Sequence, residues 1–138
     1  MPQGCATCPY QQTGLCAALG DAKSNRRRRK VDGSVRARQH LLRAGEESGR
    51  VIVLREGWAT RFTHVPDGRR QIVGMLLPSD FVGRPGRERA AYDVTATTDL
   101  VMCCFRKKPF EELMLRTPHI GQRLLEMTLD ELDAAREW

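Results

Sequence analysis

Short apolar segments separated by turn residues, between residues 45 and 105, limit the folds open to this chain more than any other feature. Each segment is rich in β-branched or apolar residues, which is typical of β-strands. The segments are Val51–Leu54, Trp58–Thr63, Gln71–Leu76, Val94–Thr98 and Leu100–Phe105. Turn signals separate them at a spacing of about twelve residues, and Asp67-Gly68 is the clearest hairpin signal. The pattern predicts a mainly β fold, a jelly roll or related antiparallel barrel, followed by helices.

The last third of the chain changes to a helical period. Lys108 to Leu115 predicts a short helix, and Thr117-Pro118 supplies the N-cap and first-turn proline of a longer one. On the longer helix, apolar residues recur every three or four positions and form two stripes. One stripe contains Ile120, Leu124 and Met127, and the other contains Leu125, Leu129 and Leu132. One stripe can pack on the barrel, and the pattern leaves open whether the other contacts a second copy of the chain.

Length and charge restrict the class of protein. The chain has 138 residues, one domain's worth, and no apolar run approaches the length of a membrane span. Its formal net charge of +6 favours a polyanionic neighbour such as nucleic acid. The basic block Arg26–Lys30 carries part of that charge, although such blocks are more often solvated surface. We therefore expect a single-domain protein that does not enter a membrane.

Four of the five cysteines can form one ligand set. Cys5, Cys8 and Cys16 lie close together near the amino terminus, and the fourth thiol is Cys103 or Cys104. This grouping favours an iron–sulfur cluster that ties a terminal arm to the folded body. Zinc and redox-active thiols remain alternatives, and the adjacent Cys103 and Cys104 also fit the pattern of buried small hydrophobes. The odd count and the lack of an apolar leader argue against disulfides and for a cytoplasmic protein.

The sequence contains no catalytic motif. His40, His64 and His119 are scattered, and there is no HExxH motif, nucleophile elbow or phosphate-binding glycine loop. We expect each histidine at the surface and predict that the protein is not an enzyme.

Four segments carry a resemblance to a known family. They are CATCPYQQTGLC, PDGRRQIVGMLLPSDFVGRPG, TATTDLVMCCF and TPHIGQRLLEMTLDELDAAREW. Together they resemble the Crp/FNR family of transcription regulators, and within it the oxygen-sensing FNR regulators of the FnrL type. The resemblance implies an iron–sulfur arm at residues 1–20 and a cyclic-nucleotide-binding-like β-roll with flanking short helices at 21–115. A truncated dimerisation helix would follow at 116–138, and we expect the family's DNA-reading winged helix-turn-helix to be missing from this chain.

The resemblance also implies a cofactor and partners. Cys5, Cys8, Cys16 and Cys103 would bind a [4Fe–4S] cluster, which oxygen degrades to a [2Fe–2S] form. Neighbouring strand residues point to opposite faces, so only one of Cys103 and Cys104 can face the cluster. The implied partners are a second copy of the chain, DNA through the missing domain, and RNA polymerase. The dimer-interface residues that we predict are Ile120, Leu124, Met127, Leu132 and Ala135.

Other proteins with this fold bind cyclic nucleotides, which provides an alternative function. Ser79 to Gly83 resembles the start of the segment that binds the ribose and the phosphate. The positions that should supply a phosphate-binding arginine and a hydroxyl hold Ala90 and Ala91 instead. We therefore expect no cyclic nucleotide to bind. The alternative is a Crp-like module for a small ligand, with cysteines that are incidental or bind zinc.

Overall fold

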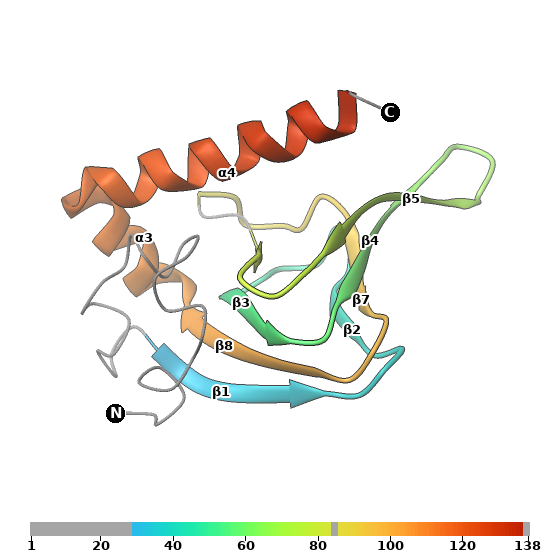
Figure 1. Cartoon of the computed structure of the whole chain (residues 1–138), viewed down its shortest axis with the longest axis horizontal. Helices are drawn as coiled ribbons and strands as arrows, with labels where there is room; N and C mark the ends of the chain where they lie inside the picture. Colours follow the sequence, from blue (N-terminus) through green and yellow to red (C-terminus); the bar gives the residue numbers. More distant parts are fainter. Residues whose placement is uncertain (1–28, 84–85, 137–138) are drawn as a thin grey trace.

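The computed structural model describes residues 29–83 and 86–136, which form two four-stranded sheets and two helices (Figure 1). The strands are β1 Arg29–Val35, β2 His40–Leu42, β3 Arg50–Glu56, β4 Ala59–His64, β5 Arg70–Leu76, β6 Phe81–Val82, β7 Asp93–Ala96 and β8 Leu100–Arg106. The helices are α3 Lys107–Arg116 and α4 Pro118–Arg136. Sheet A has the strand order β1-β8-β3-β6, and sheet B has the order β2-β7-β4-β5. All strand pairs in the described sheets are antiparallel.

An inner core joins the two sheets. Because strand side chains alternate between faces, Ile52 and Leu54 of β3 point to the same side as Met102 and Cys104 of β8. The inner core comprises Leu41, Ile52, Leu54, Ala59, Leu76, Val82, Val94, Ala96, Leu100, Met102 and Cys104. Two antiparallel sheets around one apolar core form a β-roll, so the predicted fold class is confirmed.

A second cluster of apolar side chains lies between sheet A and the helices. The helix α3 packs on β8 and β3, and α4 packs on α3. This outer cluster comprises Val51, Val53, Cys103, Phe105, Phe110, Leu113, Ile120 and Leu124. The ring centroids of Phe105 and Phe110 lie 6.0 Å apart, within the usual range for an aromatic pair. The strands β3 and β8 are therefore buried on both faces, which explains their continuous apolar sequences.

Several predicted element boundaries agree with the structure. The helix α4 begins at Pro118 as predicted, and α3 begins at Lys107, one residue before the predicted start. At the predicted hairpin between β4 and β5, Gly68 has a φ of 88°, and the Val65 N–H donates to the Arg69 carbonyl at 2.9 Å. The Asp67-Gly68 hairpin is therefore confirmed.

The strands β1, β2 and β6 are not predicted from the sequence, because β1 has only two apolar side chains, Val31 and Val35, and β2 and β6 are too short for a pattern. Antiparallel pairing accounts for them: β1 pairs with β8 from Arg29 to Val35, and β2 pairs with β7. Among the described residues, no helix is long and apolar enough to cross a membrane.

Candidate functional site

The adjacent cysteines of β8 face opposite sides of sheet A. Cys103 belongs to the outer cluster beneath the helices, with 5% of its surface exposed. Cys104 belongs to the inner core with Met102 and is 2% exposed. The predicted alternation is therefore confirmed, while the choice of Cys103 as a cluster ligand stays a prediction.

The strand β1 connects the amino-terminal segment to the edge of sheet A beside Cys103. In the register of β1 and β8, Asp32 lies opposite Cys103 and Arg29 lies opposite Phe105. Val31 lies opposite Cys104, so β1 runs beside both cysteines of β8. The other predicted ligands, Cys5, Cys8 and Cys16, lie outside the described residues.

A metal at Cys103 needs ligands from another part of the chain. Within residues 29–83 and 86–136, no group of three or more His, Cys, Asp or Glu side chains could hold a metal ion. An iron–sulfur cluster with four thiolate ligands would therefore take one ligand from Cys103 and three from the amino-terminal segment, as in the predicted ligand set. Cys104 has a different environment, because the Arg50 Nη1 lies 4.0 Å from its Sγ.

There is little empty space beside the segment that would bind a cyclic phosphate. A cavity of about 20 Å³ lies beside Ala90 and Ala91, whereas pockets for drug-sized ligands measure roughly 300 to 1,000 Å³. Two arginines line this cavity, and Arg89 donates from its Nη1 to the Gly45 carbonyl at 2.8 Å. The described geometry therefore offers little room for a nucleotide at this position.

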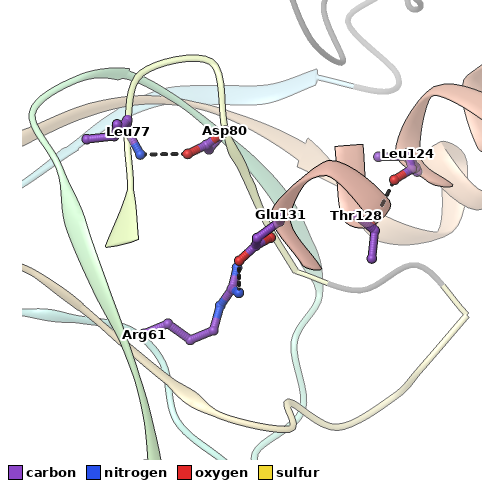
Figure 2. A network of polar contacts seen from close by, with 6 residues as sticks. All are labelled: Arg61, Leu77, Asp80, Leu124, Thr128 and Glu131. Carbon is purple, nitrogen blue, oxygen red and sulfur yellow. Dashed lines mark hydrogen bonds and ion pairs between the residues drawn. The ribbon is translucent and has the colours of Figure 1, made fainter. Parts of the chain in front are cut away.

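A larger cavity of about 870 Å³ lies between α4 and the β-roll. Its lining is mainly apolar, with Phe81 and Tyr92 from the roll and Leu124 from α4. Arg61 of β4 and Glu131 of α4 both line this cavity, and their side chains form an ion pair (Figure 2). The Arg61 guanidinium carbon also lies 4.7 Å from the centroid of the Tyr92 ring. Sequence reasoning missed Arg61, although its position two residues after the inward-facing Ala59 places it on the inner face.

Asp80 lies at one edge of the same cavity, in the turn before β6. Its Oδ2 accepts a hydrogen bond from the Leu77 N–H at 2.8 Å (Figure 2). Burial raises the pKa of the Asp80 carboxyl above its ordinary value of 3.8, and the nearby Glu131 acts in the same direction. The Leu77 hydrogen bond and Arg61 oppose this shift. Asp80, Arg61 and Glu131 therefore form one electrostatic group.

Burial divides the predicted dimer-interface residues. Ile120 and Leu124 lie in the outer cluster, and Met127 packs against it, so the contacts of this stripe are within the chain. Leu132 is exposed, together with Leu125 and Leu129 of the other stripe. The side chain of Ala135 lies outside the described part of the chain. The dimer interface therefore stays a prediction: Ile120 and Leu124 pack in the chain's own outer cluster, whereas Leu125, Leu129 and Leu132 are exposed on a single chain.

Asp93 of β7 is bonded both to β4 and to the turn that follows β2. Its Oδ1 accepts a hydrogen bond from the Ala44 N–H at 2.7 Å, and its Oδ2 lies 2.6 Å from the His64 Nε2. The Ala44 hydrogen bond and the His64 side chain lower the pKa of the Asp93 carboxyl below 3.8, although burial opposes them. The three histidines are exposed, as predicted.

We expect stability to fall at low pH through Asp93. A carboxyl with a lowered pKa stabilises the fold fully above the unfolded value near 3.8, and this contribution is lost as the pH falls through the folded value. We expect the free energy of unfolding in urea to fall less steeply between pH 5 and pH 2.5 in Asp93→Asn than in the unsubstituted chain. The asparagine does not titrate, and its side-chain oxygen still accepts the hydrogen bond from the Ala44 N–H. Asp93→Ala should cost about 1 to 3 kcal/mol at neutral pH, because it leaves the Ala44 donor without its acceptor. An unchanged slope in Asp93→Asn would contradict this account.

Sequence comparison places this geometry among known proteins. The cyclic nucleotide-binding domain model matches residues 33–117, more than half of the chain. The transcriptional activator protein FnrL of Cereibacter sphaeroides is 56% identical over 135 residues, which cover 97% of this chain and 54% of that protein. The chain spans about half the length of the curated relatives it matches.

Solved structures share the β-roll. FixK2 from Bradyrhizobium japonicum is 22% identical with a TM-score of 0.69, and the match covers 78% of this chain and 54% of FixK2. The sensor domain of the transcriptional regulator DNR from Pseudomonas aeruginosa is 13% identical with a TM-score of 0.69, covering 93% of this chain and 89% of that domain. At these identities the likeness concerns the fold alone.

Proposed function

Since this chain belongs to the cyclic nucleotide-binding domain family, in its Crp/FNR branch, we propose that it is the sensor part of an FNR-type transcription activator. In this function, Cys5, Cys8, Cys16 and Cys103 bind an oxygen-labile [4Fe–4S] cluster. The chain acts as a homodimer, and the state of the sensor controls DNA binding by a helix-turn-helix domain of the kind that the family resemblance implies.

The position of Cys103 carries this proposal. Its thiol lies on the helix-facing side of sheet A, and β1 brings the amino-terminal segment to the strand that contains it. Cys104, one residue away, points to the opposite side of sheet A and belongs to the inner core. A ligand set that combines an amino-terminal cysteine group with one strand cysteine therefore has a suitable fourth member in Cys103.

The outer cluster supplies a path from the ligand to the dimer helix. A [4Fe–4S] cluster bound at Cys103 would supply an oxygen-labile link between the amino-terminal segment and sheet A. Cys103 shares the outer cluster with Ile120 and Leu124 of α4, and closely packed side chains transmit small displacements. A change at Cys103 therefore shifts the position of α4 on the outer cluster. The exposed leucines of α4 are available to contact a second copy of the chain.

The visible absorption spectrum tests the proposal. Protein purified without oxygen should show iron–sulfur charge-transfer absorption and lose it in air, with about four iron and about four sulfide per chain before exposure. A colourless protein that contains stoichiometric zinc would contradict the proposal, because zinc has no such absorption.

The alternative is a module that binds a small ligand of the cyclic nucleotide type. The cavity of about 870 Å³ beside α4 favours it, because its volume suits such a ligand. Isothermal calorimetry with cyclic AMP and cyclic GMP should nevertheless detect no binding at physiological concentrations, because Ala90 and Ala91 provide no phosphate ligand. Binding at micromolar concentration would replace the sensor proposal with this one.

A further inference from the structure

The two halves of α4 are attached to the roll in different ways. The first half places Ile120 and Leu124 in the outer cluster. From residue 125 to residue 134, all described side chains are exposed except Met127, which is partly buried. Buried apolar side chains therefore fix the first half of α4 to the β-roll. The second half has few such contacts, so its orientation relative to the roll depends on other interactions.

Arg61 supplies such a contact from sheet B. Its side chain is 15% exposed, and it runs along the cavity wall to the Glu131 carboxylate (Figure 2). The Tyr92 ring lies beside the Arg61 guanidinium carbon at 4.7 Å, a distance at which a cation and an aromatic ring attract each other. Arg61 is therefore held by the roll at a position from which it reaches the second half of α4.

The neighbouring strand leaves room for this ion pair. Gly74 of β5 lies opposite Arg61 in the strand register. A Cβ atom built at Gly74 would lie 3.5 Å from the Arg61 Nη1 and 3.5 Å from the Glu131 Oε1, in ordinary contact with both. A side chain longer than alanine would extend toward the pair, so the glycine keeps this part of the cavity wall open to the Arg61 and Glu131 side chains.

We propose that Arg61 is a positioning residue that holds the second half of α4 against sheet B by pairing with Glu131 while Tyr92 supports its guanidinium. Because the exposed leucines of α4 lie on the same half of the helix, Arg61 sets the angle at which they meet a second copy. The Arg61–Glu131 pair lies within one chain and requires no bound cluster, whereas the angle between two copies rests on the homodimer of the proposed function.

Hydrogen exchange measured by mass spectrometry on the full chain tests the proposal. Glu131→Gln changes a half-exposed residue and should leave the fold intact, but amides 130–136 should exchange roughly two- to fivefold faster, the factor expected for an ion pair of modest strength. Arg61→Gln should have the same effect. The double variant Arg61→Glu with Glu131→Arg should exchange more slowly than either Arg61→Gln or Glu131→Gln, because it rebuilds the ion pair without the Tyr92 contact. In the unsubstituted chain, about 1 M salt should also accelerate exchange, because salt screens the pair.

A matched control separates positioning from general helix stability. Glu126 of the same helix pairs with Arg123 at 3.1 Å and does not line the cavity that holds the Arg61–Glu131 pair. Glu126→Gln should leave the exchange of amides 130–136 unchanged. The proposal would be overturned if Glu131→Gln left exchange unchanged, or if Glu126→Gln accelerated it to the same extent. Failure of the charge-swapped pair to exchange more slowly than the single variants, with Arg61→Gln folded normally, would also overturn it.

Discussion

Replacement of Cys103 by alanine should abolish stable iron binding, whereas replacement of Cys104 by alanine should leave it intact. Cys103 lies on the helix-facing side of β8, and Cys104 lies in the inner core, so one strand register cannot present both thiols to the same cluster. After reconstitution without oxygen, we expect about four iron and four sulfide per chain for Cys104→Ala and almost none for Cys103→Ala.

Alanine is the better replacement at these positions, because both thiols are buried among apolar side chains. A serine would add a buried hydroxyl, whose desolvation costs about 1 to 3 kcal/mol without a partner, and loss of iron could then reflect loss of the fold. Urea unfolding of the apo variants provides the control, since both alanine variants should unfold at similar concentrations. Retention of iron in Cys103→Ala with loss in Cys104→Ala would show that the inner-facing thiol is the ligand.

The amino-terminal ligands are tested in the same assay. Serine at Cys5, Cys8 or Cys16 should each abolish the stable cluster, because a four-thiolate site does not tolerate loss of one ligand. Normal iron content in all three variants would contradict the proposed ligand set.

The β-roll could be predicted because its central strands have strong local signals. The strands β3 and β8 are buried on both faces and read as continuous apolar runs, and Asp67-Gly68 marks a hairpin directly. The strand β1 could not be found this way, because Arg29–Val35 is a polar sequence that becomes a strand by pairing with β8. Long-range pairing of this kind leaves no periodic signal in the sequence. The family resemblance stated from four sequence segments is confirmed by the match to residues 33–117 and to FnrL.

The candidate site was predictable in part. Strand alternation separates Cys103 from Cys104, and that separation is observed. Helical periodicity reveals two apolar stripes on α4, yet it does not say which stripe packs on the chain's own sheet. That choice depends on how α3 turns into α4 over the outer cluster, a tertiary feature. The Arg61 contact was missed for a related reason, because Glu131 follows it by 70 residues and only the fold brings the two together.

Replacement of Leu129 by alanine should weaken self-association by roughly 30-fold. Leu129 is 48% exposed and lies between Leu125 and Leu132 on the outward stripe of α4. Burial of its exposed surface against a second copy contributes about 1 kcal/mol in each protomer. A two-fold symmetric interface contains the residue twice, so the change costs about 2 kcal/mol, which is roughly 30-fold in the dissociation constant.

Sedimentation of the reconstituted chain, over a range of concentrations and without oxygen, measures this constant. Leu115 of α3 provides the matched control, because it is also an exposed leucine, at 82%, but lies outside the α4 stripe. Leu115→Ala should leave the dissociation constant unchanged. Since neither leucine belongs to the inner core or the outer cluster, both variants should unfold at the same urea concentration as the unsubstituted chain when all three are measured as monomers, well below the dissociation constant. If both alanine variants weakened self-association equally, the association would be nonspecific. If only Leu115→Ala weakened it, the interface would lie on α3 and not on α4.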